Sequence, residues 1–148
     1  MSFTRREVCG LIPALITGAS AIPALAAQDD SLPSATFAFE SMPVQSFGHA
    51  QMREILKGKL ATGEQIEAHE TTLPPKGYPH PPHHHVHSEM WLIREGTVEL
   101  TISGASHRLG PGGLGFVRSN EEHGIKNVGA GPAIYFVVAI GPGADAQS

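Results

Sequence analysis

The chain has 148 residues, of which 41% are hydrophobic, 16% charged and 6% aromatic, and its formal net charge is −4. This composition is typical of one globular domain and excludes a disordered chain. Seventeen Gly and twelve Pro argue against a helical bundle and favour short strands joined by tight turns. The negative net charge, with no block of basic residues, gives no electrostatic basis for binding nucleic acid, so no nucleic-acid partner is expected.

Residues 1–26 are expected to be a signal peptide. The pair Arg5 and Arg6 precedes an uncharged stretch over residues 8–27, and a small-residue cleavage site ends at Ala26. The arginine pair resembles the signal recognised by the twin-arginine translocase, which carries folded proteins. An uncleaved membrane anchor is the alternative, because an uncharged stretch of this length can span a bilayer. With cleavage, the protein is expected to be periplasmic or secreted.

Removal of this segment would also remove Cys9, the only cysteine of the chain. The mature protein would then form no disulfide and offer no thiol nucleophile. Residues 27–35 are polar and contain Pro33, which is typical of a flexible linker. Residues 36–148 are expected to form a single domain.

The domain is expected to be all-β, because it contains many short β-type runs and no convincing helical period. The runs cover residues 42–47, 53–60, 65–73, 90–94, 97–103, 114–117, 124–127 and 133–140. Polar and apolar residues alternate over 97–102, which predicts that Val98, Leu100 and Ile102 face inward. Residues 133–140 are almost continuously apolar, which predicts a strand buried on both faces. Short strands at this spacing favour a sandwich or a small barrel.

A cluster of histidines is the strongest chemical signal. Five of the nine histidines lie between residues 80 and 87. His83 and His85 are two residues apart and would point to the same side of an extended segment, and Glu89 follows at the start of the next apolar run. Two imidazoles and a carboxylate can then converge on a metal ion.

The spacing of these residues resembles that of the cupin family. The first motif of that family is Gly, five residues, His-x-His, three or four residues, Glu, six residues and Gly. This chain has the same spacing at Gly77, His83, His85, Glu89 and Gly96. The second motif ends in a His and an Asn, and the chain matches it at Gly112, His123 and Asn127. Arg118 and Asn120 stand where the second motif has Pro and Gly, so the chain departs from the family in the turn before His123.

The resemblance implies an antiparallel jelly-roll β-barrel with one divalent transition metal held by His83, His85, Glu89 and His123. Mn or Fe is favoured, since folding around the metal before export would protect a weakly binding ion from competition; Zn, Ni, Co or Cu is possible. No other cofactor is expected, because the Gly-rich segment 110–115 is not followed by a helix. A barrel that keeps the pattern without binding metal is the alternative. Small members of the family are commonly dimers, which implies a homodimer.

Other side chains are expected around the metal. Glu89 is a candidate proton carrier as well as a ligand, and Trp91, His87, Ile125 and Phe116 are expected to shape the pocket. Core packing is the simpler interpretation of Trp91. His80, His84 and His87 are alternatively solvated residues at the rim, and His49, His69 and His107 are expected to be surface or hydrogen-bonded strand histidines.

Two functions follow from this interpretation. The first is an exported metalloenzyme of the dioxygenase, decarboxylase, isomerase or lyase type that acts on a small, oxygen-rich organic molecule. The second is a periplasmic protein that binds a metal or a small ligand without catalysis. The surplus histidines favour the second function, whereas free coordination positions on a four-ligand metal favour the first.

Overall fold

The computed structural model describes residues 30–146. The predicted signal peptide, residues 1–26, and the first residues of the predicted linker lie outside this range. Almost all regular structure is β-strand, with two short 3-10 turns, η1 (Phe39–Ser41) and η2 (Ala144–Ala146). Within the described residues, no helix is long and apolar enough to cross a membrane.

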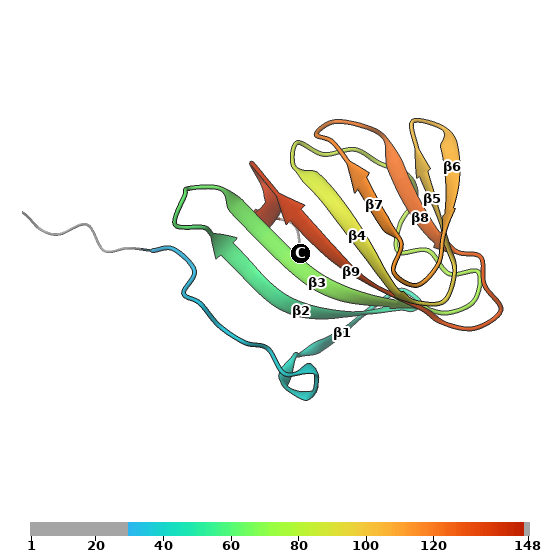
Figure 1. Ribbon diagram of the computed structural model, residues 1–148, viewed down its shortest axis with the longest axis horizontal. Helices are drawn as coiled ribbons and strands as arrows, with labels where there is room; N and C mark the ends of the chain where they lie inside the picture. The colour runs from blue at the N-terminus through green and yellow to red at the C-terminus, as the bar shows by residue number, and fades with distance from the viewer. Residues whose placement is uncertain (1–29, 147–148) are drawn as a thin grey trace, which may run out of the picture.

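The strands form two antiparallel sheets (Figure 1). The larger sheet has six strands in the order β1-β2-β3-β9-β4-β7, and the smaller has three in the order β6-β5-β8. The strand bounds are Val44–Phe47 (β1), Ala50–Lys59 (β2), Gln65–Leu73 (β3), Ser88–Glu95 (β4), Val98–Ile102 (β5), Ala105–Leu109 (β6), Leu114–Val117 (β7), His123–Asn127 (β8) and Ala133–Ile140 (β9). The predicted all-β class is confirmed.

The two sheets face each other but do not close into the predicted barrel. Among the described residues no ladder of hydrogen bonds joins one sheet to the other. A single isolated bridge, between His83 in the β3–β4 connection and His123 at the start of β8, ties a loop to the smaller sheet. The apolar core lies between the sheets, with Leu73 and Tyr135 from the larger one and Val98 and Leu100 from the smaller one.

All eight predicted runs coincide with strands, and β3, β7 and β9 have the predicted bounds. The strand that was not predicted is β6, because its first four residues are exposed and its sequence, Ala-Ser-His-Arg-Leu, lacks an alternating pattern. Ser103 and Gly104, with φ of 47° and 80°, form the two-residue turn of the β5–β6 hairpin. Positive φ at both positions matches the right-handed twist of a hairpin, so this Ser-Gly pair was the available signal for β6.

The prediction for β5 is confirmed, because Val98 and Leu100 are buried and Ile102 is partly buried against the core. The prediction that β9 is buried on both faces is wrong. Its residues alternate between fully and partly buried, starting with buried Ala133 and ending with partly buried Ile140. β9 lies between β3 and β4 in the sheet, but no second layer covers the outer face of that sheet completely.

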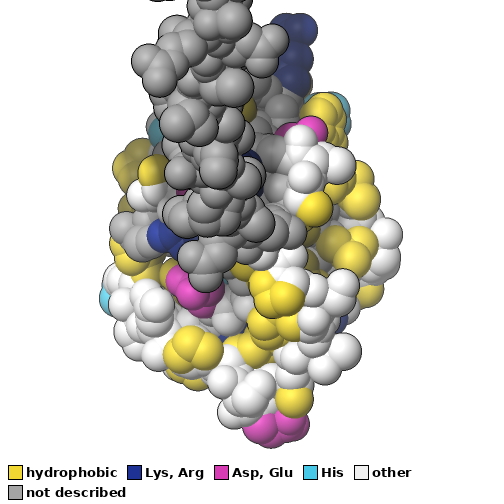
Figure 2. Space-filling model, turned by 90° about the vertical axis from the view of Figure 1, so that its left-hand side faces the viewer, with side chains coloured by type: hydrophobic (Ala, Val, Ile, Leu, Met, Phe, Trp, Pro, Cys, Tyr) yellow, Lys and Arg dark blue, Asp and Glu magenta, His cyan; other side chains and the backbone are white. Residues whose placement is uncertain are grey.

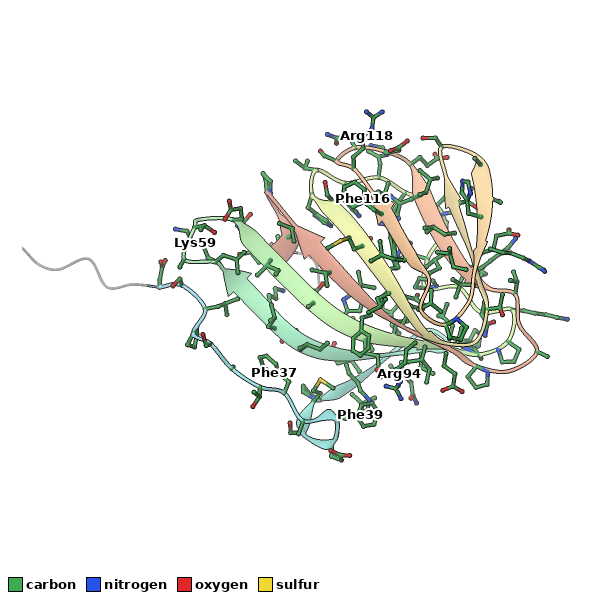
Figure 3. All side chains as sticks on the ribbon, in the orientation of Figure 1. Phe37, Phe39, Lys59, Arg94, Phe116 and Arg118 are labelled. Atoms are coloured by element: carbon green, nitrogen blue, oxygen red, sulfur yellow. The ribbon has the colours of Figure 1, made fainter. Side chains whose placement is uncertain are left out.

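The segment before β1 packs against the larger sheet. The backbone N–H of Leu32 donates to the carbonyl of Lys59 at 2.7 Å. The guanidinium of Arg53 lies 4.2 Å from the centre of the Phe39 ring, and that of Arg94 lies 5.5 Å from it. Figure 3 shows Phe39 and Arg94 close together on this side of the sheet. Two cationic groups against one aromatic ring stabilise the position of the segment.

Gly96, directly after β4, is the position where the fold most clearly requires glycine. Its φ is +77°, and a Cβ there would lie 2.7 Å from the Ala133 Cα and collide with the Pro132 carbonyl oxygen. We expect Gly96→Ala to lower the free energy of unfolding by about 3 kcal/mol, since both the backbone and the clash oppose it. Gly131→Ala is the matched control, because nothing lies within 4 Å of its added Cβ. Equal urea midpoints for the two variants would contradict this prediction.

Candidate metal centre

The four predicted ligands come from three different parts of the fold. His83 and His85 lie in the β3–β4 connection, Glu89 is the second residue of β4, and His123 is the first residue of β8. The backbone groups of His83 and His123 are hydrogen-bonded in both directions, at 3.0 and 2.8 Å. This bridge brings the connection from the larger sheet to the edge of the smaller one.

The side chains of these residues converge. The ring centres of His83 and His123 are 4.7 Å apart, as are those of His85 and His123, and those of His83 and His85 are 5.2 Å apart. The candidate donor nitrogens of the three rings all lie within 4.8 Å of one another. The Glu89 carboxylate lies beside them, with Oε1 3.2 Å from His85 Nε2 and Oε2 3.6 Å from His123 Nε2.

Three ring nitrogens of this cluster are buried and have no hydrogen-bond partner: His83 Nδ1, His85 Nε2 and His123 Nε2. Buried polar atoms nearly always have a hydrogen-bond partner, so three unpartnered nitrogens close together require an explanation. A cation held by the three nitrogen lone pairs supplies it. The residues present therefore fit a metal ion, and the donor set of three imidazoles and one carboxylate suits a divalent transition metal.

Backbone carbonyls orient two of the rings. Nδ1 of His85 lies 2.9 Å from the carbonyl oxygen of His87, and Nδ1 of His123 lies 2.8 Å from that of Glu121. A carbonyl can only accept, so each Nδ1 carries the proton and each Nε2 presents its lone pair. This arrangement of backbone acceptors behind imidazoles is the usual one at metal sites.

The electrostatics keep two of the donor groups, His83 and Glu89, in the form that binds a metal. Burial, followed by the nearby imidazoles, lowers the pKa of His83 to about 4, so this ring is neutral at pH 7. Burial alone would raise the pKa of Glu89, but the adjacent imidazoles outweigh it and hold the carboxyl below its usual range. Conversely, burial alone would lower the pKa of His123, but the Glu89 carboxylate and the Glu121 carbonyl raise it.

His87 belongs to the cluster rather than to a solvated rim. Its side chain is 2% exposed, its ring stacks on that of His85 with centres 3.6 Å apart, and its Nε2 lies 3.4 Å from Glu89 Oε1. The rim interpretation of this residue is therefore wrong, because its ring is buried against His85 and close to Glu89. His84 is exposed, as the rim interpretation required, and His80 is partly buried with its ring 4.1 Å from that of His83.

A cavity of about 220 Å³ opens next to the cluster, between the two sheets. Three of the predicted pocket residues line it: Trp91, His87 and Ile125. The Trp91 ring is tilted against that of His123 with centres 5.3 Å apart, and the side chain is also part of the core. Trp91 therefore both lines the cavity and packs in the core.

Phe116 does not line the cavity. It is 55% exposed and lies on the outer face of β7 (Figure 3), opposite the inward-facing Gly115 and Val117. The inference from the sequence placed this aromatic residue in the pocket, whereas strand alternation places it outside. An aromatic side chain on the outer face leaves this part of the sheet hydrophobic.

Sequence inference did not assign two cavity residues, Glu67 and His69 of β3, to the site. His69 Nδ1 lies 2.8 and 2.9 Å from the two carboxylate oxygens of Glu67. The expectation of a hydrogen-bonded strand histidine is thus confirmed for His69. The available signal was the polar alternation of Glu67, His69 and Thr71 within a strand of a buried sheet.

The departure from the second cupin motif leaves the turn intact. Asn120, which replaces the motif glycine, adopts φ +61°, and Asn is among the few residues that tolerate such a value. Its backbone N–H donates to the carbonyl of His85 at 2.7 Å. The motif Asn127 is 1% exposed, and its amide donates to the carbonyls of Leu73, Pro74 and Gly131. Asn127 is therefore a structural residue that joins the connections around the site.

Comparisons with known proteins agree with this geometry. Residues 69–139 match the family model described as the cupin domain. No curated protein matches the chain significantly in sequence. Solved cupin structures share the fold, so the chain has a cupin-like fold.

Three of these solved structures illustrate which kinds of protein share the fold. An RmlC-like cupin from Shewanella frigidimarina is 19% identical, with a TM-score of 0.63 and coverage of 77% of this chain and 97% of that one. A predicted oxalate decarboxylase from Thermotoga maritima is 17% identical, with a TM-score of 0.62 and coverage of 72% and 99%. A sugar phosphate isomerase from Silicibacter pomeroyi is 17% identical, with a TM-score of 0.61 and coverage of 71% and 74%.

The lowered pKa of His83 predicts a pH-dependent stability of the metal-free protein. Between pH 6.5 and about 4, the unfolded chain binds a proton at this ring that the folded protein does not bind. The free energy of unfolding should therefore rise with pH across this window and be lower at pH 5 than at pH 7. His83→Gln removes the titrating group and should flatten the profile, whereas exposed His84→Gln should not. Urea unfolding of chelator-treated protein at several pH values tests this, and an unchanged slope in His83→Gln would contradict it.

Proposed function

We propose that this cupin-like protein is an exported mononuclear metalloenzyme that acts on a small, oxygen-rich organic molecule. The observation that carries the proposal is the convergence of three buried, unpartnered imidazole nitrogens with the Glu89 carboxylate at one end of an internal cavity. Three imidazole nitrogens and one carboxylate exclude Ca²⁺ and Mg²⁺ as good fits, because both prefer oxygen ligands.

His83, His85, Glu89 and His123 would hold the ion. A bound divalent ion would supply Lewis-acid polarisation of a substrate oxygen. The side chains around the ion determine which molecules fit beside it. Trp91 and Ile125 exclude water from part of the cavity, and the volume of about 220 Å³ admits only a small molecule.

Glu89 is the residue of the cluster best placed to move a proton. One of its oxygens lies 3.2 Å from His85 Nε2 and 3.4 Å from His87 Nε2. His87 is not one of the four proposed ligands, so its ring can hold a proton that Glu89 releases or takes up. A dioxygenase, decarboxylase, isomerase or lyase reaction is compatible with these groups. The names of the similar structures, a predicted decarboxylase and an isomerase among them, support this range without selecting one member of it.

Mn or Fe is the proposed metal, and Zn, Ni, Co or Cu would fit the same donors. The argument is the export route: folding around the ion before crossing the membrane would protect a weakly held metal from Cu and Zn. The support for export is the sequence of residues 1–26 alone, with Arg5, Arg6 and the cleavage site at Ala26. The twin-arginine translocase is accordingly a proposed partner, and the periplasm or the medium the proposed location.

A non-catalytic protein that binds a metal or a small ligand is the second candidate. The observation in its favour is the pair of additional imidazoles at the cluster, His87 against His85 and His80 against His83. Additional imidazoles next to a site can pass a metal ion in or out. Binding of more than one ion per chain, with no product from any substrate, would favour this candidate.

We also propose that the protein forms a homodimer through the outer face of the larger sheet. Leu92, Leu114 and Phe116 of β4 and β7 are 46%, 57% and 55% exposed and lie on neighbouring strands in register. β7 is the edge strand of the sheet among the described residues. Figure 2 shows hydrophobic side chains exposed in groups on the surface. An apolar face beside a free edge is usually covered, and a second copy would cover both.

Elemental analysis of the mature protein exported by its own signal tests the metal site. We expect about one Mn or Fe ion per chain. The His83→Ala, His85→Ala double variant should bind the ion more than about 100-fold more weakly, since two of four ligands are lost. His84→Ala is the matched control, because this side chain is exposed and lies between the two ligands. Absence of metal from the wild-type protein, or its retention in the double variant, would contradict the proposal.

The proposed dimer predicts that Phe116→Glu yields a monomer. Two carboxylates buried in a symmetric apolar interface have no partner, which should weaken association by at least about 100-fold. Light scattering coupled to gel filtration measures the mass of each species. Arg118→Glu is the control for added negative charge, because Arg118 is exposed beyond the end of β7 (Figure 3). A wild-type monomer, or a dimeric Phe116→Glu variant, would show that this face is not the interface.

A further inference from the structure

The cavity contains a second polar group besides the metal cluster. Glu67 and His69 lie two residues apart on β3, and both line the cavity. The side chain of Glu67 is 10% exposed and that of His69 is 18% exposed. Both carboxylate oxygens lie within 2.9 Å of His69 Nδ1. A buried carboxylate against one ring nitrogen fixes the orientation of an imidazole and leaves Nε2 as the nitrogen that can exchange a proton.

The sheet register places this pair on the same face of the larger sheet as Glu89 of the metal cluster, two strands away from it. Glu67 on β3, Ala139 on β9 and Glu89 on β4 form one row across three adjacent strands, on the inner face. Two strand spacings separate the backbones of Glu67 and Glu89 by about 10 Å. The middle residue of the row is alanine, so no large side chain fills the space between the two carboxylates.

The neighbouring row has the same arrangement, with His69 on β3, Val137 on β9 and Trp91 on β4. A molecule lying over Ala139 and Val137 would therefore meet the metal cluster at one end and the Glu67–His69 pair at the other. The cavity volume of about 220 Å³ is sufficient for such a molecule.

We propose that His69 is an acid–base catalytic residue, positioned by Glu67, that removes a proton from the carbon next to a carbonyl group of the substrate. The proposal rests on the proposed function and specifies its substrate class: 2-oxo acids and related carbonyl compounds with an acidic hydrogen. The carboxylate and carbonyl oxygens of such a compound would lie at the His83, His85, Glu89 and His123 end. The acidic hydrogen would then face His69.

The step is balanced without an oxidant. The carbon–hydrogen bond breaks, the proton goes to Nε2 of His69, and the electron pair moves into the neighbouring carbonyl to give the enolate. Glu67 accepts the Nδ1–H hydrogen bond throughout and stabilises the imidazolium that forms. Return of a proton to the same carbon exchanges its hydrogen with solvent, and return to the opposite face of that carbon inverts a chiral centre.

Charged residues of β2 and β4 share rows of the sheet with the pair. Lys57 is in register with Glu67, and Glu54 is in register with His69. Across the sheet, β9 contributes uncharged Ala139 and Val137, and Glu89 lies beyond them on β4. Glu67 is thus the carboxylate in contact with the ring. Its removal should leave the ring without the acceptor that orients it and that stabilises the imidazolium formed in the step.

Pyruvate is the probe for this inference. Its methyl protons exchange slowly with water, and catalysed exchange into D₂O is followed by proton NMR. We expect Zn²⁺-loaded mature protein to catalyse the exchange, and we expect His69→Gln to lower the exchange rate at least about 100-fold. Zn²⁺ content and pyruvate affinity should stay within about twofold of wild type, because the variant leaves all four proposed ligands in place. His107→Gln, on exposed β6, is the matched control and should behave as wild type.

Glu67→Gln tests the positioning role with a nearly isosteric side chain. We expect it to retain metal and pyruvate and to lower the exchange rate about 10-fold. A readout independent of turnover is the ¹⁵N NMR signature of His69, which should show a protonated Nδ1 and an unprotonated Nε2 at pH 8 in the wild type.

The outcomes separate this inference from the proposed function. Failure to bind Zn²⁺ and every other divalent transition metal offered would overturn the proposed function, and the inference would fall with it. Normal Zn²⁺ and pyruvate binding without exchange, or unchanged exchange in His69→Gln, would overturn the inference alone. An Nε2-protonated His69 would also overturn it, since that nitrogen could not accept the proton.

Discussion

The candidate site depends on one backbone interaction, the two-way bridge between His83 and His123. Its hydrogen bonds, at 3.0 and 2.8 Å, attach the connection between β3 and β4 to the first residue of β8. Without this bridge, the histidines of the connection and the histidine of the smaller sheet would belong to separate parts of the fold. The bridge also sets their backbones at the distance of paired strands, so that short imidazole side chains can meet at one point.

A set of satisfied polar groups around the bridge supports it. The amide of Asn127 joins the end of β8 to the end of β3 and to the start of the β3–β4 connection. The backbone N–H of Asn120 supports the same connection by donating to the carbonyl of His85. The cost of burying these polar groups is offset because each has a partner. The unpartnered atoms are concentrated in the imidazoles of the cluster. The same structure thus combines a rigid frame with a small set of free donor atoms, which is the arrangement that binding a metal requires.

The inner face of the larger sheet has two groups of polar, titratable side chains with a space between them. Small residues of β9, above all Ala139, separate Glu67 on β3 from Glu89 on β4. The outer face of the same sheet has the opposite character at β4 and β7, where Leu92 and Phe116 are exposed. A single sheet therefore provides both the polar interior and the apolar exterior, since alternate residues of each strand face opposite sides.

The sequence by itself determined the strands and the local part of the site. Strand signals depend on alternation and turns within a few residues, and the spacing of His83, His85 and Glu89 depends only on extended backbone. Tertiary structure decided the rest. It buried His87 in the cluster and turned Phe116 outward. It also left the two sheets unclosed and placed the Glu67–His69 pair two strands away from Glu89 on the same face. The side that a strand presents to a cavity depends on which strands become its neighbours, and that pairing is set by contacts between residues far apart in the chain.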